Sequence, residues 1–253
     1  MEGRDYTRDS GQLPPHPVLP RYYTHPEERS AFVRRIFDHT AGDYDRVEGL
    51  IGIGRGSRYR REALQRAGLQ TGMRVLDVGT GTGLVAREAL AVVGDTGAVI
   101  GLDPSMAMLR SGAFPPSVPL VQGCAEQIPL AAAQFDLVSL GFALRHVAEL
   151  LAVFREFHRV LRPGGIVCLL EITPPQGAWA RALLRFYLGK VVPVLSRTVA
   201  RYEDTPLLLR YFWDTIEACA APAQVLDALE RAGFTGARRH VEVGVFSEYT
   251  ARR

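Results

Sequence analysis

The feature that most constrains this chain is a strand-like run that enters a glycine-rich turn. Residues 75–83 read Val-Leu-Asp-Val-Gly-Thr-Gly-Thr-Gly, so an apolar run with an acid is followed by three alternating glycines. Glycine lets a chain turn sharply and lets backbone N–H groups approach a ligand, and the helix expected after the turn offers its positive N-terminal end. The pattern predicts a cradle for a nucleotide-like cofactor at the end of a strand.

A second apolar run, residues 98–102, ends in Asp103, about twenty residues after the last glycine. A carboxylate at the end of the next strand is placed to accept two hydrogen bonds from a ribose diol. The Asp-Pro-Ser sequence at 103–105 is also compatible with a simple helix start, which leaves a purely structural role for Asp103 open.

Two cofactor classes compete for the glycine turn. Residues 81–86 fit the G-x-G-x-x-A form of the nicotinamide fingerprint. The glycines at 79, 81 and 83 directly after Asp77 instead resemble the acid-x-Gly-x-Gly-x-Gly loop of class I methyltransferases that use S-adenosyl-L-methionine (SAM). About seventy residues of helical character precede this loop, whereas nicotinamide-binding folds often start near the first strand. We therefore expect SAM rather than NAD.

The composition fits one soluble domain. The chain has 253 residues with 47% apolar content, enough to bury one large core. Its net charge is +3 and its basic residues are scattered, so nucleic acid is not an expected partner. The three cysteines, Cys124, Cys168 and Cys219, lie far apart and share no ligand spacing with the histidines. Neither a disulfide framework nor a metal site is therefore expected.

The first residues of the chain are polar and lack the apolar core of a signal peptide. No stretch approaches the roughly twenty apolar residues that cross a bilayer. We expect a cytoplasmic protein. The sequence leaves open a peripheral contact with a membrane and a homodimer.

Residue patterns divide the chain into parts. Residues 1–26, rich in proline and polar residues, are expected to form an irregular N-terminal arm, and residues 27–253 a single domain. Within that domain a helical cap precedes the first strand. Residues 173–234 are expected to form a largely helical insertion on the substrate side.

Strands and helices alternate through the rest of the domain. Strand-like runs occur at 73–79, 98–103, 118–122, 135–140 and 165–172. The clearest helix begins near Val147 and is expected to end at Gly164-Gly165. The runs 237–243 and 245–251, separated only by Gly244, demand a hairpin. Together these patterns predict an α/β fold with a doubly wound, mostly parallel seven-stranded sheet whose last strand is antiparallel.

Several motifs together resemble one family of class I methyltransferases. They are Ile36-Phe37-Asp38, Ala41-Gly42-Asp43-Tyr44-Asp45, Gly141-Phe142-Ala143-Leu144-Arg145-His146-Val147, Leu170-Glu171-Ile172 and Tyr211-Phe212-Trp213-Asp214-Thr215-Ile216. With the glycine loop, they are similar to the UbiE family of ubiquinone and menaquinone biosynthesis C-methyltransferases. The likeness runs from about Phe32 to Phe234. The SAM motifs are common to the whole superfamily, and the Phe-x-Leu-Arg segment is more specific to the family.

The resemblance implies roles for individual residues. A cofactor-binding set for SAM, whose product is S-adenosyl-L-homocysteine, would comprise Tyr44, Asp77, Gly79, Thr80, Gly81, Asp103, Pro104, Met108, Cys124, Ala125 and Glu126. A substrate-binding set would comprise Phe142, Tyr187 and Tyr211, with Arg145 and His146 as the catalytic pair. No metal is implied.

Structural alternatives stand beside three of these roles. Tyr44 would close over the cofactor, or it packs in the core of an amphipathic helix. Gly79 would contact the methionine end of SAM, although the turn needs glycine even without a ligand. Asp77 would bind the cofactor, or it orients the loop by accepting bonds from backbone N–H groups.

Two departures from the family pattern limit the comparison. Before Ala125-Glu126 the family usually has Asp, which can accept a hydrogen bond from the adenine amino group, whereas this chain has Cys124, a weak acceptor. After Arg145 the family has Asn, whereas this chain has His146. The first change moves adenine recognition towards backbone groups, and the second indicates a different substrate.

Methylation of an aromatic carbon needs an electron-rich ring and the later loss of a ring proton. Arg145 is always protonated, so it suits a bond to a phenolate oxygen or to a positioned water. His146, with an ordinary pKa near ~6.5, would take up a proton, or it caps the helix expected near Val147.

We expect SAM-dependent methyl transfer to a ring carbon of a lipophilic hydroquinone. The alternatives are O- or N-methylation of another small aromatic or natural-product metabolite, and a SAM-binding protein without turnover. The insertion would line an apolar pocket or touch a membrane through Arg181, Arg185 and Lys190, or it packs on the core with these residues in water.

Overall fold

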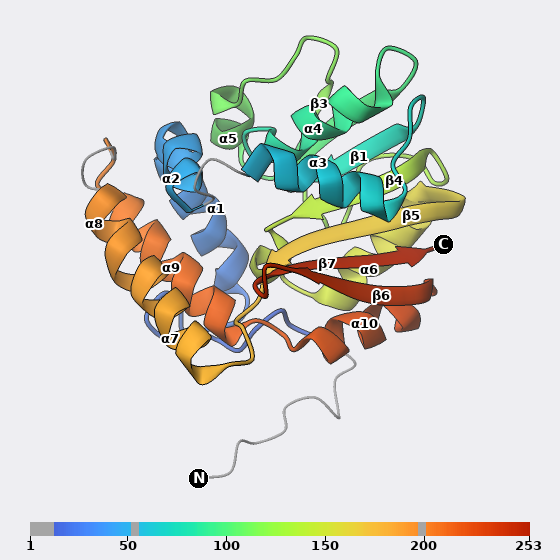
Figure 1. Ribbon diagram of the computed structural model, residues 1–253. Helices are drawn as coiled ribbons and strands as arrows, with labels where there is room; N and C mark the ends of the chain where they lie inside the picture. Colours follow the sequence, from blue (N-terminus) through green and yellow to red (C-terminus); the bar gives the residue numbers. More distant parts are fainter. Residues whose placement is uncertain (1–12, 52–55, 197–200) are drawn as a thin grey trace.

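The computed structural model describes residues 13–51, 56–196 and 201–253 (Figure 1). Within these residues seven strands form one sheet in the order β3-β2-β1-β4-β5-β7-β6. The strands are β1 (Arg74–Val78), β2 (Ala98–Asp103), β3 (Leu120–Gln122), β4 (Phe135–Gly141), β5 (Leu161–Ile172), β6 (Thr235–Glu242) and β7 (Phe246–Arg252). The first five run parallel, and β7 runs antiparallel to both β5 and β6. The predicted doubly wound sheet with an antiparallel last strand is therefore confirmed.

Alternate residues of the central strands enter two separate cores, as period-two strands require. Val75, Leu137 and Cys168 face α3 (Gly56–Ala67) and α4 (Leu84–Val93) on one side. The opposite face packs against α6 (Leu150–Val160) and α10 (Pro222–Arg231). The sheet is thus covered by helices on both faces (Figure 1).

A third layer lies beyond the carboxyl ends of β4 and β5. It consists of α1 (Glu28–Thr40), a 3₁₀ turn (Ala41–Asp43), α2 (Tyr44–Ile51), α5 (Met106–Ser111), α7 (Ala178–Phe186), a π-helical turn (Tyr187–Val191), α8 (Val192–Ser196) and α9 (Thr205–Ala218). Most of these helices share a third apolar cluster, in which Phe32, Ile36, Leu208 and Phe212 meet Ile172 from the end of β5. The cap and the insertion therefore enclose the strand ends, which is where open α/β sheets bind ligands.

The helix expected from Val147 to the paired glycines is shorter than predicted. It begins at Leu150, because the Glu149 carboxylate accepts hydrogen bonds from the backbone N–H groups of Leu151 and Ala152. It ends at Val160, because Leu161 pairs with Phe135 and already belongs to β5. The predicted start of β5 at Gly165 is wrong for the same reason, since the Pro163-Gly164 segment forms an irregularity inside the strand pair.

The described part of the N-terminal arm, residues 13–26, has no helix or strand and is tied to the domain. The Leu13 carbonyl accepts a 2.9 Å bond from the Leu150 N–H, and the Pro15 carbonyl accepts a 2.7 Å bond from Ala220. The Tyr22 hydroxyl donates to Asp214 of α9 over 2.6 Å. Residues 1–12 lie outside the described residues. No helix in the described part of the chain is long and apolar enough to cross a bilayer.

Candidate active site

The glycine loop is held from below by Asp77. This buried carboxylate accepts one hydrogen bond from the Ser139 hydroxyl and one from the Thr80 hydroxyl, each with an oxygen–oxygen distance of 2.7 Å. Burial raises the pKa of Asp77 to about 6. Asp77 and Thr80 lie beneath the loop rather than along the cavity that the loop borders. The geometry therefore agrees with the structural alternative for Asp77, in which it orients the loop, and the hydroxyls of Ser139 and Thr80 donate the bonds that hold it.

Gly79 and Gly81 both have φ near +60°, a conformation that favours glycine. A Cβ on Gly81 would also lie 3.2 Å from the Met108 methyl, and one on Gly79 would lie 2.9 Å from Cβ of Ala143. Any larger residue would strain the turn and narrow the cavity beside it.

Asp103 lies at the end of β2, directly across from the loop. Its Oδ2 accepts a 2.8 Å bond from the Gly81 N–H, and its Oδ1 accepts a 2.8 Å bond from the Ser105 N–H. Burial raises the pKa of Asp103 to about 6, and the carboxylate keeps further acceptor sites for a ribose diol. Asp103 fixes the loop and holds the backbone just before α5, which agrees with the structural alternative, and its role towards a ribose stays a prediction.

A cavity of about 900 Å³ lies between the glycine loop and helix α1. The predicted residues that line it are Tyr44, Gly79, Gly81, Asp103, Pro104, Met108, Cys124, Ala125, Glu126, Phe142 and His146. We call it the cofactor cavity. Its α1 wall, formed by Ser30, Val33, Arg34 and Phe37, was not predicted, because α1 reads only as an amphipathic helix.

A second cavity of about 820 Å³ shares Tyr44 and Phe142 with the first. Its other lining residues are Glu48, Gly56, Tyr59, Arg60, Arg145, Ile172, Leu188, Val192, Leu209, Phe212, Trp213, Ile216 and Phe246. We call it the acceptor cavity. Tyr187 and Tyr211, predicted to bind substrate, line neither cavity: Tyr187 packs against the third cluster, and Tyr211 is fully buried within it.

The wall between the two cavities has unusual backbone geometry at Phe142. Its φ is +58°, which is uncommon for a bulky residue and costs roughly 1–3 kcal/mol. Such outliers cluster at functional sites. Tyr44, the other shared residue, packs against Phe37 with ring centroids 6.0 Å apart, and burial raises its pKa to about 12.

Arg145 enters the acceptor cavity as half of a buried ion pair. Its Nη1 donates to Oε1 of Glu171 and to the Phe142 carbonyl, the latter over 2.9 Å, and its guanidinium lies 5.4 Å from the ring centre of Phe212. Burial raises the pKa of Glu171. Nε of Arg145 and Oε2 of Glu171 are buried without a hydrogen-bond partner among the described residues. An arginine with a free donor at this position can hold an oxygen atom of a bound ring.

His146 faces the cofactor cavity in an aromatic environment. Its ring stacks on Tyr211 with centroids 5.4 Å apart and meets Phe37 edge-on at 5.2 Å. Burial, followed by the charge of Arg145, lowers the pKa of His146 well below 6.5, so the expectation of an ordinary pKa is wrong. The helix-cap alternative is also wrong, since Glu149 caps α6. Both ring nitrogens are buried and have no partner among the described residues, so the neutral ring can accept a proton.

Sequence reasoning missed the Arg60–Glu48 ion pair in the acceptor cavity. These residues come from α3 and α2 and meet only in the folded chain. Helix α3 is rich in arginine, so Arg60 does not stand out from its neighbours in the sequence.

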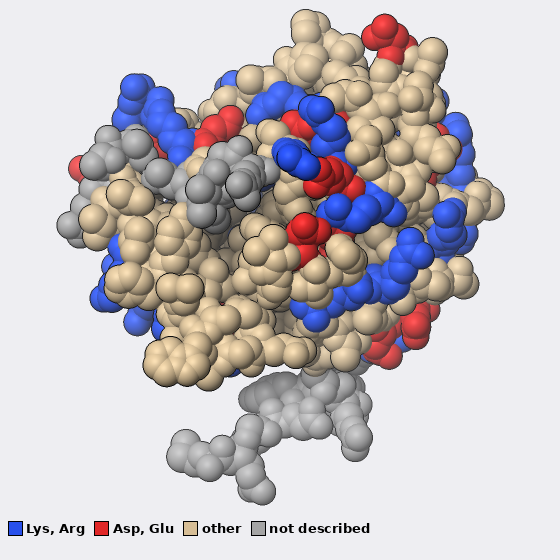
Figure 2. Space-filling model, in the orientation of Figure 1, with Lys and Arg blue, Asp and Glu red and all other residues tan. Residues whose placement is uncertain are grey.

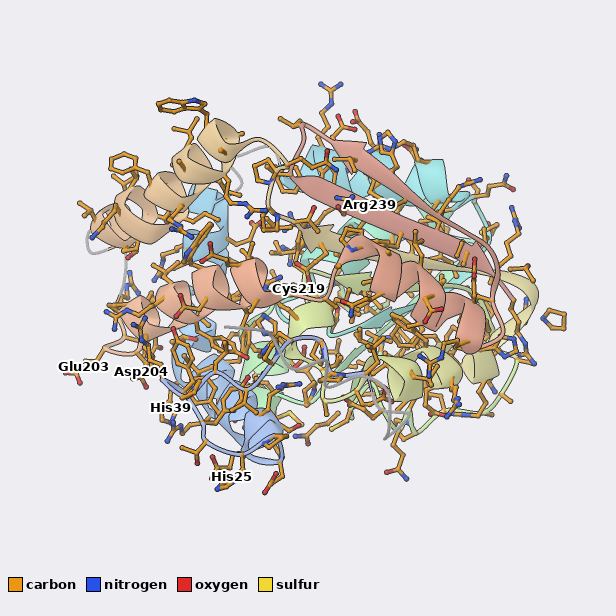
Figure 3. All side chains as sticks on the ribbon, turned by 90° about the horizontal axis from the view of Figure 1, so that it is seen from below. His25, His39, Glu203, Asp204, Cys219 and Arg239 are labelled. Atoms are coloured by element: carbon orange, nitrogen blue, oxygen red, sulfur yellow. The ribbon has the colours of Figure 1, made fainter. Side chains whose placement is uncertain are left out.

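Polar contacts join the N-terminal helical cap, residues 28–51, to the cofactor-loop side of the sheet and to the segment that leads into α9. The Thr82 hydroxyl donates to Asp45, and the Ser105 hydroxyl donates to Asp38. Buried Asp43 accepts bonds from the backbone N–H groups of Arg201 and Tyr202 and from the Thr205 hydroxyl, at 2.7–3.0 Å. Figure 3 shows a further link at the surface, where His39 of α1 and Asp204 before α9 approach to 2.9 Å.

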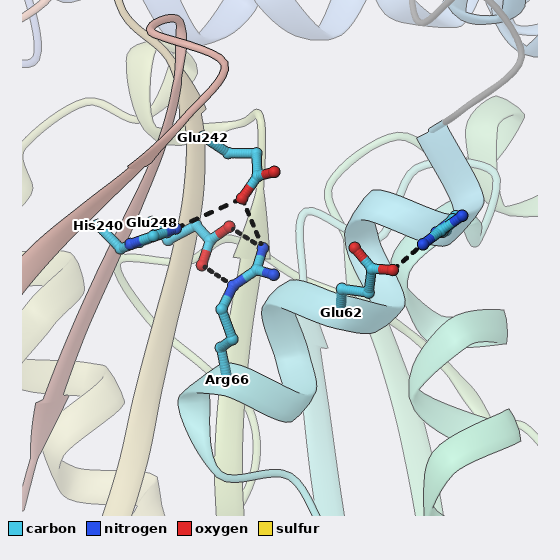
Figure 4. A network of polar contacts seen from close by, with 6 residues as sticks. Glu62, Arg66, His240, Glu242 and Glu248 are labelled. Carbon is cyan, nitrogen blue, oxygen red and sulfur yellow. Dashed lines mark hydrogen bonds and ion pairs between the residues drawn. The ribbon is translucent and has the colours of Figure 1, made fainter.

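One cluster of potential metal ligands lies on the hairpin of β6 and β7. It consists of His240, Glu242 and Glu248. Figure 4 shows that Arg66 of α3 occupies the space between the two carboxylates, pairing with Glu248 over 2.6 Å and with Glu242 over 3.5 Å. The arginine already pairs with both carboxylates, so the cluster is an ion-pair network that joins α3 to the sheet.

Known proteins share both the sequence and the fold of this chain. The sequence profile of the ubiE/COQ5 methyltransferase family matches residues 24–252. The Coxiella burnetii protein named ubiquinone/menaquinone biosynthesis C-methyltransferase UbiE is 31% identical over 227 residues, covering 87% of this chain and 90% of the relative. The Geobacillus kaustophilus demethylmenaquinone methyltransferase is 34% identical over 217 residues, covering 82% and 89%.

Among solved structures, a SAM-dependent methyltransferase from Aquifex aeolicus superposes with a TM-score of 0.59 at 21% identity, covering 82% of this chain and 97% of that one. This likeness supports the fold. The profile match over nearly the whole described domain, together with identities above 30%, shows that the chain belongs to the ubiE/COQ5 methyltransferase family.

Proposed function

We propose that the protein transfers a methyl group from SAM to a ring carbon of a lipophilic hydroquinone. The observation that carries this proposal is the pair of cavities that share the wall of Tyr44 and Phe142. One cavity borders the glycine loop, and the other is largely apolar and holds a buried arginine. Two ligands that must react with each other need such adjacent sites.

The cofactor cavity has the features that SAM requires. The Asp103 carboxylate suits a ribose diol, and Gly79 and Gly81 leave room for the methionine end. Cys124 is a weak acceptor at the position where adenine would lie, so we expect adenine to be held by backbone groups near Ala125.

The acceptor cavity favours an apolar aromatic ligand. Ile172, Leu188, Val192, Phe212 and Trp213 supply most of its wall. The names of the Coxiella burnetii and Geobacillus kaustophilus relatives both refer to quinones, and this agrees with a hydroquinone that has an apolar tail. O- or N-methylation of another aromatic metabolite stays the alternative, because the cofactor cavity does not specify the acceptor atom.

SAM supplies an electrophilic methyl group on a positively charged sulfur. The protein's task is to align the ring carbon, exclude water and handle charge. Nε–H of Arg145 would donate to the ring oxygen and stabilise its phenolate character. His146, kept neutral by its surroundings, would accept the released proton directly or through a water molecule. Glu171 would act through Arg145 by holding its guanidinium in place.

We also propose that α7, in the helical insertion, lies against a membrane surface. This amphipathic helix has no buried residue, and Trp179, Leu183 and Phe186 project at helical spacing with Trp179 91% exposed. No acidic residue occurs between Glu171 and Glu203. Figure 2 shows no acidic side chains at the lower left, over α7, and the helix itself carries Arg181 and Arg185. Trp213 belongs both to the acceptor cavity and to the groove beside α7, so an apolar tail could pass this way.

The test is incorporation of labelled methyl groups into matched hydroquinones and quinones with several tail lengths. We expect rates to rise with tail length, since burial contributes about 25 cal/mol per Å² of apolar surface. Oxidised rings should be inert because they are too electron-poor to attack the methyl group. Equal rates for reduced and oxidised rings, or a preference for small polar acceptors, would favour the alternative metabolite. SAM binding without any methylated product would favour a protein without turnover.

A further inference from the structure

The acceptor cavity contains a second arginine that the reaction described above does not use. Arg60 is only 3% exposed, and its Nη2 donates to Oε1 of Glu48. Its guanidinium lies 5.3 Å from the ring centre of Phe142, whereas Arg145 donates to the backbone carbonyl of the same residue. Two guanidinium groups therefore flank one wall residue of this cavity.

The hydrogen bonding of Arg60 is incomplete. Its Nε is buried and has no partner among the described residues, although Arg60 lines the cavity. A buried donor without a partner is destabilising, so native structures leave few of them. Arg145 shows the same incompleteness at its own Nε. Both arginines line the cavity, so ligand oxygens would complete the hydrogen bonding of both groups once the guanidinium groups turn towards them, because neither Nε is exposed in this structure.

Gly56, the first residue of α3, preserves the space that this pair occupies. A Cβ at this position would lie 2.4 Å from Nη1 of Arg60 and 2.9 Å from Oε1 of Glu48. The backbone of Gly56 is not in the left-handed region, so its conformation does not demand glycine. The absence of a side chain here instead fits the need to seat the ion pair at the cavity wall.

We propose that Arg60, positioned by Glu48, binds a second oxygen of the acceptor ring while Arg145 binds the first. The site would then select rings with two oxygen substituents over rings with one. This inference rests on the proposed function and names a specificity determinant of the same cavity. The contribution of Arg60 is a charge-assisted hydrogen bond, and no proton is transferred.

The experiment combines variants of the protein with analogues of the acceptor. A hydroquinone is compared with two deoxy analogues of the same tail, each lacking one ring oxygen. Binding is followed by the fluorescence of Trp213, which lines the cavity, and methyl transfer by product formation. We expect the unaltered protein to bind the hydroquinone roughly ten- to a hundredfold more tightly than either analogue, as a bond to a charged group would give.

The substitution Arg60→Met should abolish the preference over one deoxy analogue and leave the preference over the other intact. Gly56→Ala, which displaces the ion pair but retains the arginine, should reduce the same preference and serves if Arg60→Met does not fold. Arg58→Met is the matched control, since Arg58 lies on the same helix with its side chain 84% exposed. It should change neither preference.

Equal loss of affinity for the hydroquinone and for both analogues in Arg60→Met would assign Arg60 a purely structural role and overturn the inference. If the unaltered protein methylates hydroquinones while Arg60→Met keeps every preference, only the inference fails. If the unaltered protein neither binds nor methylates any hydroquinone, the proposed function fails as well.

Discussion

The two cavities differ in how completely their polar groups are paired. On the cofactor side, Asp77 and Asp103 each accept two hydrogen bonds from the protein itself. On the acceptor side, Arg60 and Arg145 each retain a buried Nε without a partner among the described residues. The cofactor cavity is thus preorganised before any ligand arrives, whereas the acceptor cavity leaves charge-assisted bonds for the acceptor to complete.

The largest expected effect lies on the preorganised side. Asp103→Ala should weaken SAM binding by roughly a hundredfold to ten-thousandfold, because two bonds to a charged group are lost at about 1.5–3 kcal/mol each. Calorimetric titration measures this directly. Asp95→Ala, on the exposed turn before β2, is the control and should bind SAM normally. Gly81→Val should also block binding, since it strains the turn and fills the cavity. Unchanged SAM affinity in both Asp103→Ala and Gly81→Val would show that the cofactor does not bind at this position.

The next largest effect tests whether Arg145, in the acceptor cavity, contributes to turnover and not to SAM affinity. Arg145→Met should lower kcat by about 10²–10³, the loss typical for one donor to a developing oxyanion, with SAM affinity within about twofold. The change leaves the buried Glu171 carboxylate without its ion-pair partner, so Arg145→Met should be made together with Glu171→Gln to preserve folding. A parallel fall in SAM affinity and turnover would mean that the two cavities do not divide the work as proposed.

His146 lines the cofactor cavity and follows Arg145 in the chain, and it tests the pH dependence. His146→Asn should reduce kcat by about a hundredfold, the lower end for general acid–base catalysis. The pKa of His146 lies well below 6.5, and the ring acts as a base only when neutral. The acid limb of the pH–rate profile should therefore fall well below pH 6.5 and disappear in the variant. A limb that persists unchanged in His146→Asn would exclude the histidine as the base.

The smallest expected effect concerns the outer surface of the acceptor side. Vesicles containing anionic lipid should bind the protein more tightly than neutral vesicles. The expected gain is about fivefold for each of Arg181, Arg185 and Lys190 that lies near the membrane surface, and salt should reduce this gain. Trp179→Ser should reduce binding to both kinds of vesicle. Val243→Ser is the control, because Val243 is equally apolar and 81% exposed but lies on the turn between β6 and β7. Equal losses in the two variants would argue against α7 as the contact.

The cofactor side could be predicted from the sequence, whereas much of the acceptor side could not. The cofactor loop is contiguous, so its strand, glycines and acid are visible as one motif, and the apolar runs of β1, β2 and β4 fix most of the sheet. The predicted start of β5 at Gly165 is wrong because the strand begins at Leu161, which pairs with Phe135, a residue distant in the sequence. Arg60 and Glu48 could not be identified, since only the folded chain brings these residues of α3 and α2 together as an ion pair at the cavity wall.

Asp43 and Tyr44 are consecutive residues with contacts on different sides. Asp43 ties the cap to the segment at residues 201–205 that leads into α9, and Tyr44 touches both cavities. A shift of Tyr44 on cofactor binding would therefore be passed through Asp43 to the helix that carries Phe212 and Trp213. Binding of the two ligands should then be coupled. By thermodynamic reciprocity, SAM should change the affinity for the acceptor by the same factor by which the acceptor changes the affinity for SAM.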